Sequence, residues 1–418
     1  MIRPARLRPR ADAALEKISL RNVLVRLGDG AMRTEGVSGL VPRLAVFYAA
    51  LFVLPGIQMP FFPVWLEAKG VNTGMIGIVL AAPIVARLLA VPVVMREADR
   101  RNAVRAALIV CGFASTAGYI LIGLSASATF ILVAYALTSL ATTPQMPLAE
   151  TYALKELAAR KRAYGPVRLW GSFAFIVGNF VAGFAADVIS ARDLIWLIVA
   201  ASVLIAFAAL ALPSMAQRPV APNAPAAVPQ NLLRDRLFIA VVAAASLIQA
   251  SHAEYYGFSA VQWSNDGFDG TVIAALWALG VAAEIVLFAL QSRLPPFFEP
   301  TVLVMTGACG AALRWIGMAL DPPVFMLTML QLLHALSFGA THLGALMFLA
   351  RHAPSMQAAT AQGYLAIASG VTMAGAMALS GVLYRDFGSV AYAAMALMAI
   401  AGGACGLVAH RLRRQTAR

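Results

Sequence analysis

The chain has 418 residues, of which 61% are hydrophobic and only 12% are charged, and its mean hydropathy is +0.79. A soluble globular domain carries about 25% charged residues, so this composition excludes that class and indicates an α-helical membrane protein. Outer-membrane barrels alternate polarity along strands of roughly ten residues, and that pattern is absent.

The net charge of +13 is explained by membrane topology and does not require nucleic acid as a partner. Nearly all lysines and arginines fall in alternate loops, as the positive-inside rule requires. The opposite set of loops holds only Lys69, Arg192 and Arg385. The sequence therefore predicts a multi-pass protein in a lipid bilayer, with both termini in the cytoplasm and an even number of spans.

The three cysteines do not point to a disulfide framework or a metal site. Cys111, Cys309 and Cys405 lie in separate apolar runs, far apart in the sequence. We expect them to be small core residues.

Twelve apolar runs are long enough to cross a bilayer, which takes about 20 residues. They are residues 43–66, 73–95, 103–124, 127–152, 165–189, 193–213, 236–262, 270–291, 300–320, 323–350, 359–384 and 388–411. The sequence thus predicts an all-α membrane protein of twelve transmembrane helices.

The runs divide into two groups of six. Residues 1–42 are rich in arginine and are expected to be a disordered basic cytoplasmic tail. Residues 214–235 contain four prolines and predict a flexible cytoplasmic linker. The expected domains are two six-helix bundles, 43–213 and 236–411, followed by a short cytoplasmic tail, 412–418. Two equal halves joined by a long inner loop resemble the major facilitator architecture, with a substrate site between the halves near mid-membrane.

A glutamate and an arginine lie just inside two neighbouring spans. Glu150 and Arg168 are 18 residues apart on antiparallel helices, so we expect that their side chains can meet. Ionisable groups inside membrane spans are costly and by default suggest a function. A salt bridge at the cytoplasmic interface is an equally good interpretation of the position alone.

Two spans carry regular polar or aromatic faces. Arg168, Ser172, Phe175 and Asn179 share one face of the fifth span. In the seventh span the spacing predicts a second face that lines a cavity, although contacts between helices would explain it too. That face comprises Gln249, His252, Tyr256, Ser259 and Trp263. Glu254 is two residues from His252 and points to a different side.

The eighth span buries Glu284 near its middle, with Trp277 on the same face. A carboxyl group at this depth suits a proton carrier or a substrate ligand better than a structural role. Arg314 in the ninth span and His334 in the tenth could complete its surroundings.

Four segments resemble the bacterial phenylpropionate permease family of the major facilitators, which is related to lactose permease. They are the stretches from Tyr164 to Phe175, from His252 to Ala260, from Leu276 to Glu284 and from Leu332 to His342. The stretch from Pro60 to Leu66 is similar to lactose permease. The resemblance covers both halves and implies a permease of the bacterial inner membrane.

The resemblance also implies roles for individual residues. Glu150 and Arg168 match the pair that binds substrate in the sugar symporter, and Glu284 matches its substrate-linked glutamate. Arg314 and His334 match its coupling arginine and histidine.

The sequence departs from the family at two positions. Ser337 stands where the sugar symporter has its proton-carrying glutamate, so we expect the carrier elsewhere, with Glu284 as first candidate. Glu254 is the second departure, because relatives tend to have a small residue there.

Together these features predict a proton-coupled permease that moves a small organic substrate, such as an aromatic carboxylate, by alternating access. Substrate would contact Glu150, Arg168, Phe175, His252, Tyr256, Trp277 and Glu284, and Glu284, Arg314 and His334 would couple the proton. The proton gradient would drive transport without a bound cofactor or metal, and we expect a monomer. The alternatives are a sugar or nucleoside symporter, an efflux permease, and a membrane sensor or scaffold without turnover. No nucleophile–base pair, phosphate loop or metal cluster indicates an enzyme.

Overall fold

The computed structural model describes residues 20–162, 164–214, 232–293, 295, 297–354 and 357–416. These residues form helices and short connections, and no strand is assigned among them. Residues 1–19 of the expected tail, 215–231 of the expected linker and the last two residues lie outside the described part.

The helices of the first half of the chain are α2 (Leu20–Ala68), α3 (Thr73–Arg100), α4 (Val104–Leu124), α5 (Ala128–Thr142), α6 (Gln145–Ala159), α7 (Gly165–Val188) and α8 (Ile195–Leu210), with the 3-10 turn η1 (Ala191–Asp193). The second half contains η2 (Leu232–Arg234), α9 (Arg236–Ala250), α10 (Ala253–Asn265), α11 (Gly270–Leu290), η3 (Gln291–Arg293), α12 (Pro300–Ala319), α13 (Val324–Leu332), the π-helical segment η4 (Ala335–Ala340), α14 (Thr341–His352), α15 (Ala358–Phe387), η6 (Gly388–Ala391) and α16 (Tyr392–Thr416).

The chain has the twelve membrane crossings that the sequence predicts. Ten segments of the described chain are long and apolar enough to cross a bilayer, and one of them, Thr360–Gln415, holds both α15 and α16. The twelfth crossing is the pair α5 and α6, each of 15 residues, which the two residues Thr143 and Pro144 separate.

The helix that contains the first span, Gly39–Ala68, begins well before that span. We expected a disordered tail as far as residue 42, whereas α2 begins at Leu20 and runs without interruption for 49 residues.

Three spans that the sequence predicts as continuous are interrupted. Besides the break between α5 and α6, Ser251 and His252 separate α9 from α10, and η4 widens the helix between α13 and α14. At the second break Ser251 Oγ donates to Ile248 O at 2.7 Å and accepts from Trp315 Nε1 at 2.9 Å. Side chains thus provide hydrogen-bond partners for backbone and hydroxyl groups that water cannot reach in a membrane.

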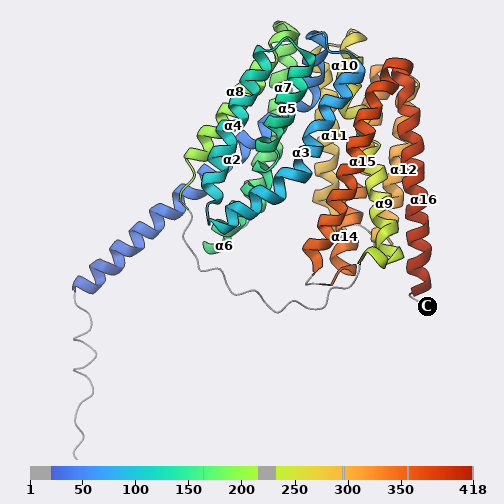
Figure 1. Cartoon of the computed structure of the whole chain (residues 1–418). Helices are drawn as coiled ribbons and strands as arrows, with labels where there is room; N and C mark the ends of the chain where they lie inside the picture. The colour runs from blue at the N-terminus through green and yellow to red at the C-terminus, as the bar shows by residue number, and fades with distance from the viewer. Residues whose placement is uncertain are drawn as a thin grey trace, which may run out of the picture.

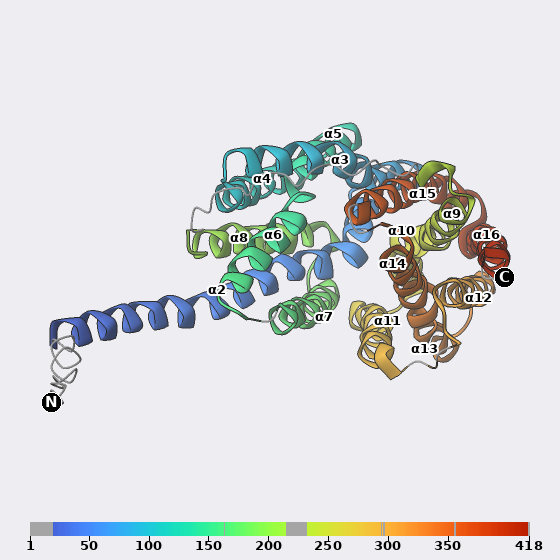
Figure 2. The same cartoon turned by 90° about the horizontal axis from the view of Figure 1, so that it is seen from below.

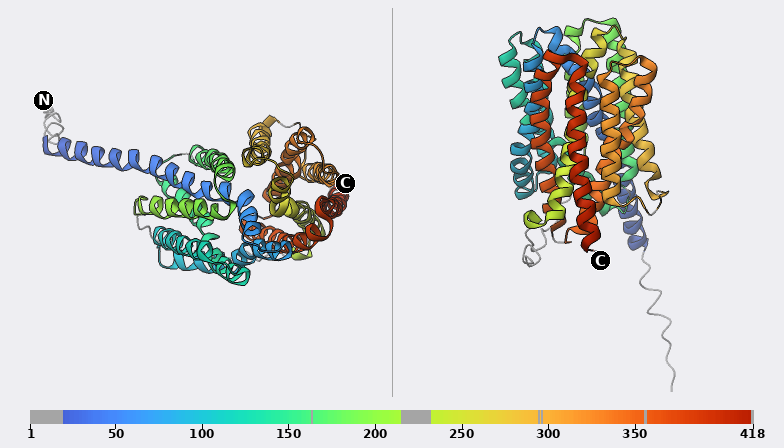
Figure 3. Two further views of the ribbon diagram at one scale, coloured as in Figure 1. Left: turned by 90° about the horizontal axis from the view of Figure 1, so that it is seen from above. Right: turned by 90° about the vertical axis from the view of Figure 1, so that its right-hand side faces the viewer.

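The helices form two groups, one of α2 to α8 and the other of α9 to α16 (Figure 2). The groups approach each other where α2 ends and α3 begins, which we call the closed end, and they diverge at the opposite, open end (Figure 1). The described ends of the chain, the start of α2 and the end of α16, lie at the open end (Figure 3).

Glycines bring the two groups together at the closed end. A Cβ atom at Gly381 of α15 would lie 2.5 Å from the carbonyl oxygen of Thr73 at the start of α3. One at Gly183 of α7 would lie 2.5 Å from the carbonyl oxygen of Gly270 at the start of α11. Only a residue without a side chain permits such close backbone contact.

A carboxylate joins the same two helices at the closed end. Asp187 of α7 accepts hydrogen bonds from the backbone amides of Gly270 at 2.5 Å and Thr271 at 3.1 Å. A negative charge at the N-terminus of a helix is stabilised by its unpaired amides. This contact therefore holds α7 against α11 while the closed end is shut.

Substituting Gly381 with valine should force α3 and α15 apart and favour a form that opens at the closed end. Spin labels at Lys69→Cys and Asp269→Cys, with the three native cysteines changed to serine, should move apart in pulsed electron resonance. The control is Gly375→Val on the same helix, where nothing lies within 4 Å of the added Cβ. Equal label distances in both variants would contradict this account of the closed end.

Asp235 at the open end caps α9 by accepting hydrogen bonds from the amides of Leu237 and Phe238 and from His352 Nε2. Burial alone would raise its pKa, but these hydrogen bonds outweigh burial and hold the pKa of Asp235 below its ordinary value. A carboxyl whose pKa is lowered in the folded state stabilises the protein at pH values above its unfolded-state pKa, which is near 3.9. That stabilisation is lost as the pH falls through the folded-state pKa.

Asp235→Ala should therefore lower the free energy of unfolding by about 1 kcal/mol at neutral pH, the usual effect of losing an N-cap. Asp235→Asn, which keeps an oxygen at the cap, should lower it less. Melting temperatures in detergent should show the Asp235→Ala difference at pH 7 and a smaller one below about pH 4. A difference that stays constant over this range would rule out the charged cap as its source.

Candidate functional site

A cavity of about 790 Å³ lies between the two groups of helices. The first group lines it with Phe52, Met59, Tyr164, Gly165, Arg168, Leu169, Ser172 and Phe175. The second lines it with Tyr255, Tyr256, Trp277, Gly280, Val281, Glu284, Ile285, Phe288, Gln291, His334 and Phe338. The lining is largely apolar with a few ionisable groups, as is usual for small-molecule sites.

Helix α7 provides the cationic side of the cavity. Arg168, Ser172 and Phe175 line it from one helix face, as their spacing predicts. The guanidinium carbon of Arg168 lies 4.0 Å from the ring centre of Phe52, and its Nη1 donates to Ser172 Oγ at 3.4 Å. The fourth residue of that face, Asn179, donates to the carbonyl of Ala274 across the closed end at 2.8 Å. Arg168 forms no ion pair with the residues that the structure describes, so most of its donors are free to bind an anion.

The second group of helices carries a buried chain of polar contacts that ends at the cavity. Arg314 of α12, which is 0% exposed, donates to Gln331 Oε1 at 2.5 Å and to His334 Nδ1 at 2.9 Å. His334 Nε2 lies 3.4 Å from Glu284 Oε2. These contacts thus connect the buried guanidinium of Arg314 to the carboxyl of Glu284 on the cavity wall.

The guanidinium of Arg314, as a hydrogen-bond donor, determines the tautomer of His334. A guanidinium can only donate, so His334 Nδ1 must accept and be unprotonated. The ring proton of neutral His334 is then on Nε2, the nitrogen that faces Glu284. His334 can therefore donate a hydrogen bond to an ionised Glu284. Through this bond His334 links the positive charge of Arg314 to the carboxyl of Glu284.

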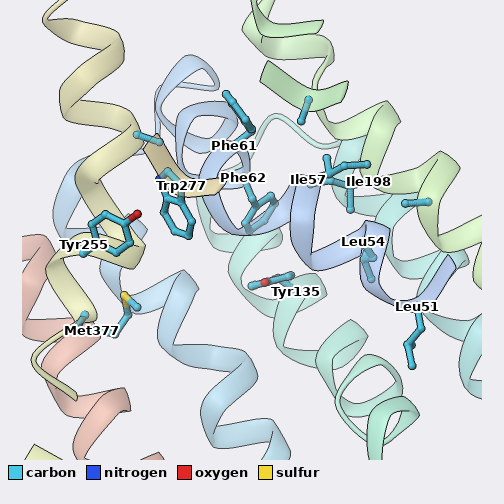
Figure 4. Packing of buried hydrophobic residues seen from close by; sticks show 14 of the residues in the cluster. Leu51, Leu54, Ile57, Phe61, Phe62, Tyr135, Ile198, Tyr255, Trp277 and Met377 are labelled. Carbon is cyan, nitrogen blue, oxygen red and sulfur yellow. The ribbon is translucent and has the colours of Figure 1, made fainter. Parts of the chain in front are cut away.

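Aromatic rings form the rest of the wall. Tyr255 and Trp277 are stacked with ring centres 4.7 Å apart, and the guanidinium of Arg314 lies over Tyr255 at 4.4 Å. Figure 4 shows Trp277 and Tyr255 near two aromatic residues of the first group, Phe62 and Tyr135. The ring centres of Phe62 and Tyr135 are 4.7 Å apart. A continuous apolar core thus supports the cavity on the side of the closed end.

The predicted face of the seventh span is only partly at the cavity. Tyr256 lines it, but His252, assigned as a substrate ligand, is 0% exposed and is absent from the lining. His252 Nε2 lies 3.1 Å from Ser337 Oγ, and its Nδ1 lies 3.1 Å from the carbonyl of Gln249. His252 nevertheless stacks on Tyr256 with ring centres 5.6 Å apart, so the two residues share one side of the span and His252 lies one layer behind the cavity wall.

Glu150 is also absent from the cavity lining. No ion pair joins it to Arg168 among the described residues, although both lie close enough to Tyr48 to influence it electrostatically. The expected meeting of the two side chains is therefore not found in this open form.

A smaller cavity of about 370 Å³ shares Met59 and Tyr256 with the large one. Gln58 donates to Tyr135 Oη at 2.6 Å and accepts from Tyr119 Oη at 3.1 Å on its wall. It has hydrogen-bonding groups but no ionisable acid or base of the Asp, Glu, His, Lys or Arg type in its lining.

Several lining residues escaped the sequence analysis, among them Phe52, Tyr164 and Phe288. They lie in or beside apolar runs, where an aromatic residue gives no contrast with its neighbours. Among the described residues no group of histidine, cysteine, aspartate and glutamate could hold a metal. Cys111 is buried as expected, whereas Cys309 is exposed and is not a core residue.

Two bundles around a shared cavity are the architecture of a multi-pass membrane transporter. The family model described as "MFS_1 like family" matches residues 41–395, and the chain belongs to this family of major facilitators. The chain is 29% identical over 366 residues to a protein described as a probable 3-phenylpropionic acid transporter of Escherichia coli (strain K12), covering 85% of this chain and 94% of that protein. It is 26% identical over 352 residues to a maltose permease of Geobacillus stearothermophilus, covering 82% and 87%.

Solved structures share the fold at low sequence identity. A mutant of the nucleoside transporter NupG matches with a TM-score of 0.79 and 14% identity, covering 88% of this chain and 99% of that one. A bacterial homolog of the human lysosomal transporter Spinster, in an inward-facing and occupied conformation, matches with a TM-score of 0.66 and 14% identity, covering 89% and 96%.

Proposed function

We propose that this protein is a proton-coupled permease that imports a small aromatic carboxylate by alternating access. The observation that carries the proposal is the free guanidinium of Arg168 opposite Glu284 across an apolar, aromatic cavity shared by both bundles. The relative described as a 3-phenylpropionic acid transporter supports this substrate class.

The cavity suits an amphipathic anion. Arg168 would bind the carboxylate through paired, charge-assisted hydrogen bonds. The ring of the substrate would lie among Phe175, Tyr256 and Trp277, where stacked or edge contacts with aromatic rings are favourable.

Glu284 would couple the proton to the substrate. An ionised Glu284 places a second negative charge in a cavity that must accept an anion, and like charges in a poorly hydrated space repel strongly. Protonation of Glu284 removes that repulsion, so the anion and the proton bind together. Arg314 and His334 would set how readily Glu284 gives the proton up.

The open end would face the cytoplasm, as the basic loops predict, and the bundles 43–213 and 236–411 would rock about the cavity. The protein would sit in the bacterial inner membrane with both termini inside. The inward opening would then release both the substrate and its proton.

Counterflow in proteoliposomes tests the substrate class. Phenylpropionate and related aromatic acids should exchange, whereas their amides, maltose and nucleosides should not. Exchange of a sugar or nucleoside without exchange of the acids would overturn the proposal in favour of another symporter. Saturable binding without any flux would indicate a sensor.

Arg168→Gln should weaken the binding of the acid by about 1.5–3 kcal/mol, the usual contribution of hydrogen bonds to a charged group. This corresponds to a roughly ten- to hundredfold higher half-saturation concentration in counterflow. Arg162→Gln removes the same charge from an exposed position at the open end outside the cavity lining and is the matched control. A similar small change in both variants would exclude Arg168 as the substrate ligand.

Glu284→Gln, which imitates the protonated carboxyl, should keep counterflow but accumulate less substrate than the wild type under an inward proton gradient. Exposed Glu97, which pairs with Arg100 and Arg101, provides the control Glu97→Gln with normal accumulation. If Glu284→Gln accumulates as much substrate as the wild type under a pH gradient, Glu284 is not a proton carrier.

A further inference from the structure

A second buried carboxyl lies outside the cavity. Glu254 of α10 is 0% exposed and does not line either cavity. Both of its carboxyl oxygens are buried without a hydrogen-bond partner, and it belongs to no ion pair of the described residues. An ionised carboxylate in this setting would be strongly unfavourable, so Glu254 carries its proton in this form.

The surroundings of Glu254 are polar, and no Lys, Arg or His of the described residues pairs with its carboxyl. Ser380 of α15 faces it, and Tyr384 of α15 and Tyr392 of α16 are the titratable side chains that lie near it from the helices packed against α10. His252, in the break just before α10, is turned away toward Ser337. The hydroxyls of Ser380 and Tyr392 are also buried without partners. Three buried polar groups thus gather here, with the Ser380 hydroxyl directed at the carboxyl of Glu254, and such a cluster calls for an explanation.

This cluster lies directly behind the contact that shuts the closed end. Ser380 precedes Gly381, whose backbone touches α3 at Thr73 and Gly77. One turn along α10, Phe258 stacks on Tyr384 with ring centres 4.8 Å apart, which fixes α10 against α15. A Cβ at Gly257 would lie 3.1 Å from Met377 of α15 and 3.6 Å from Leu80 of α3. Separation of α3 from α15 at the closed end would therefore uncover the surface of α10 and α15 next to Glu254.

We propose that Glu254 is a second proton-binding site, which is loaded when the closed end opens and sealed when it shuts. This inference rests on the proposed proton-coupled uptake. The proton leaves toward the cavity, whose wall includes the next two residues, Tyr255 and Tyr256. With one proton on Glu254 and one on Glu284, each substrate monoanion then enters with two protons. One net positive charge therefore crosses the membrane per cycle.

The charge balance gives a direct test in proteoliposomes. An imposed potassium diffusion potential of about 60 mV, negative inside, should raise wild-type accumulation of phenylpropionate roughly tenfold, as expected for one charge per cycle. Glu254→Gln should still accumulate substrate under a pH gradient, but should lose this response to potential because only one proton accompanies each anion. Glu97→Gln should respond like the wild type.

The outcomes separate this inference from the function it rests on. Absence of any pH-driven uptake by the wild type would refute the proposed function itself. Normal pH-driven uptake that is insensitive to potential, or a Glu254→Gln variant that keeps the wild-type response, would refute the role of Glu254 alone. So would a Glu254→Gln variant that melts like the wild type yet has lost counterflow.

Two further measurements keep the test independent of one variant. Glu254→Met has similar length and no polar atom, so it should show the same loss of voltage response if Glu254→Gln folds poorly. The membrane potential that just balances a known pH and substrate gradient gives the number of protons for the wild type without any substitution. A value of one proton per anion would refute the proposal.

Discussion

The burial of Arg314 is the constraint on which the second bundle depends. A guanidinium that is 0% exposed within a membrane must have its charge compensated by the protein. Its partners are Gln331, the imidazole of His334 and the ring faces of Tyr255 and Trp315, so one side chain connects α10, α12 and the region around α13. Because these same partners line or approach the cavity, the packing of the bundle and the electrostatics of the site cannot vary independently.

The first bundle is not organised around a buried charge as the second bundle is. Arg168 is partly exposed and keeps most of its donors free, so it does not organise the packing around it. The first bundle instead contacts the second at the closed end, where glycines on α7 and α15 bring backbones together and the side chains of Asp187 and Asn179 add hydrogen bonds. Close contacts between helix backbones of this kind can separate and form again without repacking of large side chains. The asymmetry between a rigid, charge-organised bundle and a bundle with a free cation suits a site that must open repeatedly.

The sequence predicts the membrane crossings well because about 20 consecutive apolar residues have few alternatives in lipid. It also predicts the cavity face of α7, since Arg168, Ser172 and Phe175 lie on an unbroken helix where the period of 3.6 residues holds. The period does not reveal that His252 lies outside the lining, because its contacts with Ser337 and with the ring of Tyr256 depend on tertiary packing.

Other features of the site depend on tertiary geometry that the sequence does not contain. Whether Glu150 reaches Arg168 depends on the tilt of two helices. The aromatic wall comes from apolar runs in which Phe52 has no distinguishing context. The interruption at η4 likewise has no proline to mark it. The unusual residues themselves, Glu254, Glu284, Arg314 and His334, were evident because charge is rare in such runs.

The wide turn of η4 has a mechanical consequence for His334, the residue immediately before it. A π-helical turn holds one residue more than an ordinary turn. One extra residue rotates the preceding part of a helix by roughly a quarter of a turn relative to the part that follows. The turn therefore sets the direction of His334, whose ring presents one nitrogen to Arg314 and the other to Glu284 on the cavity wall.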